Sequence, residues 1–174
     1  MIFVTVGTHE QPFDRLVLAV DELKERKLIQ EEVMIQTGYS TVEPRYCNWK
    51  QWLSKAQMEE YMRSSRIIIT HGGPSSFFQS LQMHKIPIVV PRQKKYGEHV
   101  NDHQVSFVRE LEDTNKDLIV VKDLRDLPRV VRDYEELAAR QSSEIHNNNK
   151  HFNQQLSAMV ANMLNGRQKA GISV

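Results

Sequence analysis

The stretch RIIITHGGPSS, residues 66–76, decides the fold. Its first part, Arg66 to Thr70, is a short β-branched run, which is typical of a strand buried on both faces. Two glycines follow directly, and glycine lets the backbone turn sharply at the end of a strand. A helical pattern then runs from Phe77 to Met83. The stretch therefore predicts a strand, a tight turn and a helix in succession.

The same alternation of short apolar runs and amphipathic stretches extends outward along the chain. The other predicted strands are Ile2 to Val6, Glu32 to Thr37, Ile86 to Val90 and Leu118 to Val121. The other predicted helices are Asp14 to Lys27, Gln57 to Arg63, Val100 to Glu112, and Leu124 to Leu164 in two pieces joined near Gln141 to Ser143. Tyr39 to Lys50 contains Pro44 and no clear period, so we expect a loop there.

This alternation predicts an α/β fold, a single Rossmann-like domain with a parallel sheet of about five strands and helices on both faces. The predicted core is 1–123, and 124–174 is predicted to be a C-terminal helical extension of the same domain that docks a partner. A length of 174 residues suits one domain.

The composition excludes several classes of protein. With 23 Lys and Arg against 22 Asp and Glu, the charge gives no support to nucleic-acid binding. A single cysteine, Cys47, excludes a disulfide framework and a cysteine-rich metal site, and we expect it to be structural. No apolar run approaches the ~20 residues that cross a bilayer, and the first one, Ile2 to Val6, has no basic leader. We therefore expect a cytoplasmic protein.

In open parallel sheets, ligands bind beyond the carboxyl ends of the strands. The segments at those ends are 7–13, 38–40, 71–76 and 91–103. The richest is His71 to Ser76, whose glycines and following helix N-terminus together can cradle a diphosphate. The alternative is a plain strand–turn–helix connection in which a serine caps the helix. The chain lacks a G-x-x-x-x-G-K-[ST] loop and a G-x-G-x-x-G after its first strand, so neither phosphoryl transfer by a P-loop nor a dinucleotide fold is favoured.

Gly7 to Glu10 follows the first predicted strand. Gly7 allows close approach of a ligand to the backbone, Thr8 or His9 can contact a phosphate or the acceptor, and Glu10 can act as a base. In the alternative reading, Thr8 caps a turn and His9 is simply exposed.

Glu98 to Gln104 gathers polar side chains around the start of a predicted helix. His99 and His103 have i, i+4 spacing, which suits a metal, helix capping or contact with a sugar, but without a third ligand we predict no metal site.

Arg92, with Lys94 and Lys95, forms a basic patch that can neutralise phosphate, approach an anionic membrane, or remain solvated. Four aromatic residues lie in one irregular segment and either cover the core or form a partner surface: Tyr39, Tyr46, Trp49 and Trp52.

Three stretches together carry a resemblance to a known family: IFVTVGT (2–8), THGGPSS (70–76) and EHVNDHQ (98–104). From Met1 to about Leu164 the chain resembles the C-terminal, donor-binding half of GT-B glycosyltransferases of family 28. It is most similar to PssE-like subunits of exopolysaccharide and capsule galactosyltransferases. It is also similar to the eukaryotic catalytic subunit that makes chitobiosyl-diphosphodolichol.

The resemblance implies a UDP-sugar as donor substrate, no cofactor, and metal-independent inverting transfer of a hexose, expected to be galactose, to a lipid-linked saccharide in exopolysaccharide or capsule biosynthesis. Family members often carry an acidic residue near Gln79 for the ribose, and an amide lacks that charge. The implied contacts to the nucleotide-sugar are Gly7, Thr8, His71, Gly72, Gly73, Ser75, Ser76, Gln79, Arg92, His99, Asn101, Asp102 and Gln104, and His9 or Glu10 lies nearest the transfer chemistry.

A GT-B enzyme has two Rossmann-like domains, and this chain has the length of one. The resemblance therefore implies a heteromer, in which a PssD-like subunit binds the acceptor and attaches the complex to the inner face of the plasma membrane. The isolated chain is expected to self-associate through the surface meant for that partner. A second hypothesis is a non-catalytic enhancer that stabilises its partner and ignores nucleotide. A third, an unrelated small hydrolase, ranks last because no G-x-S-x-G is present.

Overall fold

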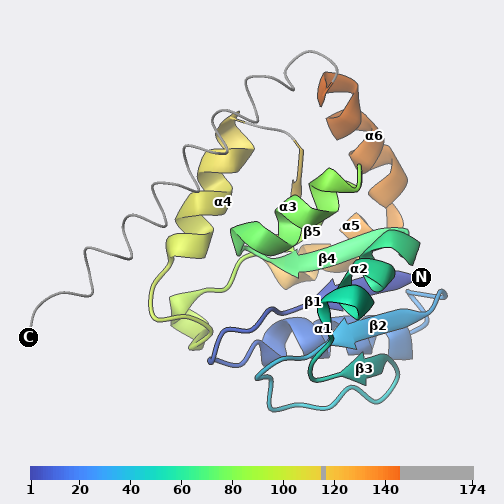
Figure 1. Ribbon diagram of the computed structural model, residues 1–174, viewed down its shortest axis with the longest axis vertical. Helices are drawn as coiled ribbons and strands as arrows, with labels where there is room; N and C mark the ends of the chain where they lie inside the picture. The colour runs from blue at the N-terminus through green and yellow to red at the C-terminus, as the bar shows by residue number, and fades with distance from the viewer. Residues whose placement is uncertain (115–116, 146–174) are drawn as a thin grey trace, which may run out of the picture.

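The computed structural model describes residues 1–114 and 117–145, which form one α/β unit around a twisted parallel sheet (Figure 1). Within this part of the chain the sheet has six strands in the order β3-β2-β1-β4-β5-β6. Their bounds are β1 Ile2–Thr5, β2 Val33–Gln36, β3 Asn48–Lys50, β4 Ile67–His71, β5 Ile88–Val90 and β6 Ile119–Val120. The predicted α/β class and parallel sheet are confirmed.

The two central strands explain why the chain folds this way. Every residue of β1 and β4 is buried, because helices cover both faces of the sheet there. Ile2 pairs with Ile67 and Thr5 pairs with Thr70, so the two strands end side by side. The strand order reverses between them, and in doubly wound sheets this switch point is where a crevice opens beyond the carboxyl ends.

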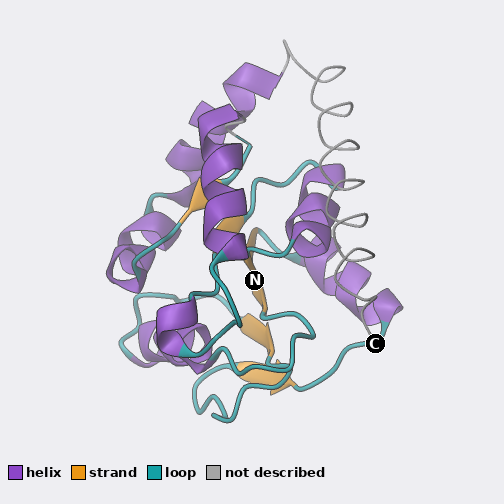
Figure 2. Ribbon diagram, turned by 90° about the vertical axis from the view of Figure 1, so that its left-hand side faces the viewer, coloured by secondary structure: helices purple, strands orange, loops and turns teal. Residues whose placement is uncertain are grey.

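Helices lie on both sides of the sheet (Figure 2). One face packs on α1, α5 and α6, and the other packs on α2, α3 and α4. The helix bounds are α1 Asp14–Glu25, α2 Lys55–Ser64, α3 Pro74–Gln82, α4 His103–Thr114, α5 Leu127–Arg132 and α6 Tyr134–Ile145. Alternate residues of β1 divide between the layers, since Ile2 and Val4 contact the first core cluster and Phe3 contacts Met62 of α2 in another.

One predicted loop contains a strand. The segment 39–50 includes β3, so the sheet has six described strands rather than about five. All three β3 side chains are exposed, and the strand forms by pairing with β2, in which Ile35 opposes Trp49. An edge strand with no buried face leaves no apolar run in the sequence, which is why the prediction was wrong.

Two predicted helix boundaries also differ. The helix expected from Val100 begins only at His103, because Asn101 Oδ1 accepts a hydrogen bond from the His103 N–H at 3.1 Å and holds a turn. The C-terminal helices break at Asp133, and residues 141–143 lie inside α6. The expected continuation to Leu164 lies outside the described residues. No described helix combines the length and apolarity that crossing a membrane requires.

Cys47 is buried in the largest core cluster, as its predicted structural role requires. Burial raises the pKa of its thiol to about 12, and the carboxylate of Asp21 acts in the same direction. The Asp21 carboxylate also accepts hydrogen bonds from the backbone N–H groups of Arg45, Tyr46 and Cys47 at 2.8–3.0 Å. A protonated, buried thiol of this kind is a packing group rather than a nucleophile.

Candidate functional site

Three loops meet at the switch point, beyond the carboxyl ends of β1, β4 and β5. They are the β1–α1 loop (7–13), the β4–α3 turn (72–73) and the β5–α4 loop (91–102). The sequence-predicted site residues therefore converge largely as the topology requires. How each side chain contributes differs from the prediction in several places.

The ring of His71 fills the space between two glycines. A Cβ at Gly7 would lie 2.6 Å from His71 Nε2, and one at Gly73 would lie 2.5 Å from the same atom. Gly7 also has φ +78°, a left-handed conformation that favours glycine. The backbones of both loops thus lie directly against the imidazole. A side chain at either glycine would displace the His71 ring.

Burial lowers the pKa of His71 to about 3, and the charge of Arg92 acts in the same direction, with smaller contributions from His9 and His99. The ring is therefore neutral near pH 7. A neutral imidazole in this place adds no charge of its own to the site, but it keeps a nitrogen that can take part in a hydrogen bond.

The helix after the turn starts without a side-chain cap. Gly73 is the N-cap residue of α3, Pro74 occupies the first turn, and no side chain makes a capping hydrogen bond. The predicted alternative, in which Ser75 or Ser76 caps this helix, is therefore wrong. The positive end of the α3 dipole is thus not neutralised by a capping side chain and is available to an anion. Within the first turn, Pro74 has no N–H group and the Ser76 N–H donates to the Gly73 carbonyl at 3.3 Å.

Gly72 lies against α4. A Cβ there would be 3.0 Å from the Cβ of Gln104. The Oε1 atom of Gln104 accepts a hydrogen bond from the backbone N–H of Arg92 at 3.1 Å. Gln104 therefore links the start of α4 to the loop after β5. Gln79, the predicted ribose contact, lies half-buried on α3.

His9 and His99 pack against each other across the switch point. Their ring centroids are 4.3 Å apart, and the rings are tilted by 37°. His9 Nδ1 lies 3.3 Å from the Gln11 N–H and His99 Nδ1 lies 3.3 Å from the Asn101 N–H, which donate to these nitrogens. Burial and then the charge of Arg92 lower the pKa of His99. The loops after β1 and β5 thus bring two imidazoles together, while Thr8 and Glu10 lie exposed beside them.

The i, i+4 arrangement of His99 and His103 on one helix is not formed, because α4 begins at His103. Among the described residues, no three His, Cys, Asp or Glu side chains gather as a metal site would require. Asp102 Oδ1 accepts from the Lys94 N–H at 2.8 Å, so its carboxylate shapes the loop.

Arg92 does not belong to an exposed basic patch. Its side chain is fully buried, and its guanidinium donates to backbone carbonyls at Val6 (2.8 Å), Gln11 (2.7 Å) and Glu98 (3.0 Å). The predicted direct contact between Arg92 and phosphate is therefore wrong for this structure, while Lys94 and Lys95 are exposed as expected.

Sequence reasoning missed two residues that support these loops. Gln36, at the end of β2, accepts from the Gly7 N–H at 3.2 Å and donates to the Gly7 carbonyl at 3.1 Å. Arg15 of α1 forms a paired hydrogen bond with the buried carboxylate of Glu98, at 2.7 and 2.9 Å. A polar residue inside a predicted buried strand, as at Gln36, is the one clue that sequence reasoning could have used.

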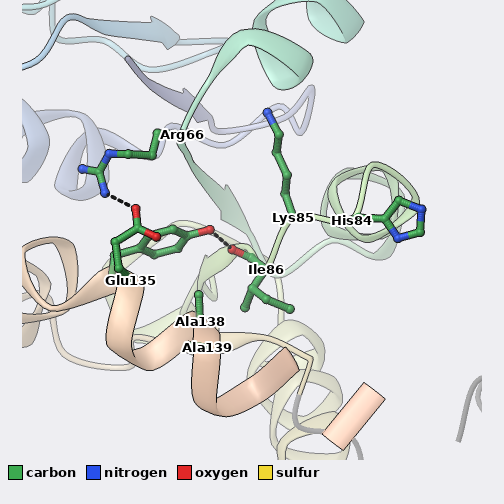
Figure 3. A pocket seen from close by; sticks show the side chains of 8 residues that line it. Arg66, His84, Lys85, Ile86, Glu135, Ala138 and Ala139 are labelled. Atoms are coloured by element: carbon green, nitrogen blue, oxygen red, sulfur yellow. Dashed lines mark hydrogen bonds and ion pairs between the residues drawn. The ribbon is translucent and has the colours of Figure 1, made fainter. Parts of the chain in front are cut away.

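A separate cavity lies at the opposite, amino end of the strands (Figure 3). Its volume is about 340 Å³, and its lining includes Arg66, Lys85 and Glu135. Arg66 pairs with Glu135 at 2.8 Å, and Lys85 Nζ donates to three carbonyls at the end of α2. Its charged groups are already engaged within the fold, so we place the candidate site at the switch point.

Comparisons with known proteins identify the family and the fold of the chain. The profile of the Glycosyltransferase family 28 C-terminal domain matches residues 1–160. Among solved structures, the glycosyltransferase SnogD from Streptomyces nogalater matches with a TM-score of 0.51 and 16% sequence identity. The match covers 84% of this chain and 39% of the SnogD chain, and at this identity it concerns the fold alone. No curated protein sequence matches significantly. The chain therefore belongs to glycosyltransferase family 28, as a C-terminal domain with the architecture of one Rossmann-like half of a GT-B enzyme.

Proposed function

We propose that this chain is the donor-binding and catalytic subunit of a two-component glycosyltransferase. In this proposal a hexose, galactose by resemblance to PssE-like subunits, passes from a UDP-sugar to a lipid-linked saccharide in exopolysaccharide or capsule biosynthesis. The observation that carries the proposal is the packing of His71 between Gly7 and Gly73 beside the uncapped N-terminus of α3. A glycine-containing turn that leads into a helix N-terminus is an arrangement that binds diphosphates in other proteins, which supports the proposal.

The chemistry follows from these groups. The acceptor hydroxyl oxygen bonds to the anomeric carbon while the bond from that carbon to the diphosphate oxygen breaks. Negative charge then develops on the departing UDP, where backbone N–H groups and the α3 dipole stabilise it without rearranging. Ser75 and Ser76 in the first turn of α3 offer hydroxyls to the same phosphates.

The proton of the acceptor hydroxyl needs a base. His9 and Glu10 are our candidates, because both lie in the β1–α1 loop that borders the switch point. His9 packs against His99, which places an imidazole at the edge of the loops that meet there, whereas the Glu10 side chain is exposed. A base must come within hydrogen-bond reach of the hydroxyl, so replacing each residue separately distinguishes them.

The proposal requires a second chain for the acceptor. The matched region covers 39% of the SnogD chain. The loops after β2 and β3 carry an exposed aromatic pair, Tyr39 and Trp52, whose ring centroids are 5.0 Å apart. Aromatic residues are enriched in protein interfaces, so this pair supports a partner contact near the site. In the proposal the partner is PssD-like and attaches the complex to the membrane.

A transfer assay tests the proposal. The chain is co-expressed with a PssD-like subunit, and transfer of labelled galactose from UDP-galactose to a lipid-linked acceptor is measured for each subunit and for the complex. We expect transfer only by the complex, and loss of transfer when Gly73→Asp is introduced. Full transfer by the lone chain would contradict the two-component proposal.

The second candidate is an enhancer that stabilises its partner without using nucleotide. Pro74 favours it mildly, since proline removes one N–H donor from the turn that would bind the diphosphate. The same assay separates the two functions, because Gly73→Asp leaves transfer intact if the chain only stabilises its partner. Ala56→Asp, which adds the same charge to the exposed first turn of α2, is the matched control.

A further inference from the structure

Arg92 is a buried cation whose described hydrogen bonds go to the backbone. Its guanidinium donates to the carbonyls of Val6, Gln11 and Glu98 at 2.7–3.0 Å, with a longer bond to Pro12 at 3.3 Å. Three of these carbonyls belong to the end of β1 and the loop that follows it, and one belongs to the loop after β5. The Arg92 side chain therefore joins its own loop to residues that lie 80 to 86 positions earlier in the sequence.

No described carboxylate accepts a hydrogen bond from Arg92, although the charge of Glu98 acts on the guanidinium and opposes the effect of burial on its pKa. The nearest carboxylate, on Glu98, already accepts two hydrogen bonds from Arg15 and one from the Gln93 N–H at 2.9 Å. No described residue accepts a hydrogen bond from Arg92 Nε. Burial lowers the pKa of Arg92 to about 10, so the side chain is still a cation near neutral pH. A buried cation is costly to a fold, so a role beyond core packing is expected for it.

The two segments that Arg92 joins carry the two imidazoles of the site. Gln11, an acceptor for Arg92, lies two positions after His9, and Glu98 directly precedes His99. The backbone N–H of Arg92 also donates to Gln104, which lies against Gly72 in the third segment. Arg92 is thus connected to all three segments around the switch point.

We propose that Arg92 is a positioning residue, which holds the β1–α1 loop against the β5–α4 loop so that His9 and His99 stay packed together at the edge of the nucleotide site. This inference rests on the proposed function only for the identity of the ligand. Its effect on the two histidines is a property of the chain alone. Arg92 acts through the loops and through its buried charge, without touching the ligand.

Two variants separate the positioning role from simple stabilisation. Arg92→Gln removes the charge and most of the carbonyl bonds, and Arg92→Lys keeps the charge but replaces the planar fork by a compact ammonium group. Arg129→Gln, which removes an exposed arginine on α5, is the control. For each full-length variant, NMR measures the contact between the His9 and His99 rings and the titration of His99, and calorimetry measures binding of UDP.

We expect Arg92→Gln to lose the contact between the rings, to raise the pKa of His99, and to weaken UDP binding by about tenfold to a hundredfold. Arg92→Lys should keep the pKa of His99 low but still lose the ring contact, and Arg129→Gln should match the wild type. If Arg92→Gln does not fold, Arg92→Lys decides alone. A folded Arg92 variant that is only less stable, with the ring contact and UDP affinity intact, would overturn the proposal.

The NMR readouts keep this test distinct from the test of the nucleotide site. If the wild-type chain does not bind UDP, the proposed function fails for the lone chain, yet the ring contact and the His99 titration still decide the role of Arg92. If the wild type binds UDP and the Arg92 variants leave both histidines unchanged, only the positioning role fails.

Discussion

The imidazole of His71 occupies the place that a side chain at Gly73 would need, since a Cβ at Gly73 would lie 2.5 Å from His71 Nε2. Gly73 is also the N-cap residue of α3. The same contact therefore fixes the distance between a buried, neutral ring and the start of the helix that faces the switch point. We derive the first prediction from this relationship.

Replacing Gly73 by alanine should displace the His71 ring or the turn, because the new methyl group cannot share the space. A shift of about 1 Å in a binding group costs up to a hundredfold in function, so we expect UDP affinity to fall by at least about tenfold. Titration calorimetry measures the change. Gly97→Ala is the control, since a Cβ there meets nothing within 4 Å and only its left-handed φ of +71° is strained, at about 1 kcal/mol of stability. Equal UDP affinity in both variants would contradict the role given to Gly73.

The stability of the chain should fall as the pH drops from about 6.5 toward 5. The pKa of His71 is about 3 in the folded state, against 6.5 as its ordinary value, so the unfolded state binds the extra proton in this range. His99, whose pKa is also lowered, acts in the same direction. For His71 alone the slope approaches about 1.4 kcal/mol per pH unit well below pH 6.5.

Urea unfolding at several pH values checks this dependence. His71→Asn should flatten the slope between pH 6.5 and 5, whereas His84→Asn, which removes an exposed histidine, should leave it as in the wild type. Above pH 7 the free energy of unfolding should not change with pH on account of these two histidines. A wild-type slope in His71→Asn would show that another group carries the effect.

Replacing Gln36 should lower both the stability of the chain and its affinity for UDP. Gln36→Leu removes one of the two acceptors of the Gly7 N–H, leaving only the Thr5 hydroxyl oxygen at 3.3 Å, and it removes the donor to the Gly7 carbonyl. It also removes the partner of the Thr5 hydroxyl, which donates to Gln36 Oε1 at 2.7 Å. Unsatisfied buried groups of this kind cost about 1–3 kcal/mol each. We expect a loss of stability of that order in denaturant unfolding, together with weaker UDP binding because Gly7 is less firmly held. Gln82→Leu at the exposed end of α3 should change neither quantity appreciably.

Replacing the exposed pair Tyr39 and Trp52 should weaken binding of the partner subunit and leave the stability of the fold nearly unchanged. The double replacement by alanine should change the free energy of unfolding by less than about 0.5 kcal/mol, since surface changes usually do. Retention of the PssD-like subunit in affinity purification should fall clearly. Leu28→Ala, which removes another exposed apolar side chain, is the control. Unchanged retention in the Tyr39 and Trp52 variant would locate the docking surface elsewhere.

Sequence reasoning predicted the parts of the fold that depend on local pattern. The apolar run before His71 and the glycines after it predicted a strand, a turn and a helix, and β4, its turn and α3 follow one another in that order. The helix begins at Pro74, three residues earlier than the predicted Phe77. β3 was missed because its exposed residues form a strand only through the backbone of β2. The sequence pattern of such a segment does not reveal the neighbouring strand whose hydrogen bonds hold it in place.

The candidate site was predicted in location but not in the role of each side chain. In the sequence Arg92 is one of three basic residues in a polar loop. In the structure its side chain is buried and donates hydrogen bonds to carbonyls that follow β1. Contacts of such long sequence separation leave no periodicity to detect. The packing of His9 against His99 is of the same kind, since each residue is unremarkable in its own loop.

The most direct test of the account is titration calorimetry of the purified chain with UDP and UDP-galactose, with GDP and NAD as controls. We predict uridine-selective binding that disappears in Gly73→Asp and persists in Ala56→Asp. If the lone chain binds nothing, the titration is repeated on the complex with its partner. Absence of uridine-selective binding there as well would contradict the claim that the switch point between β1 and β4 is a nucleotide-sugar site.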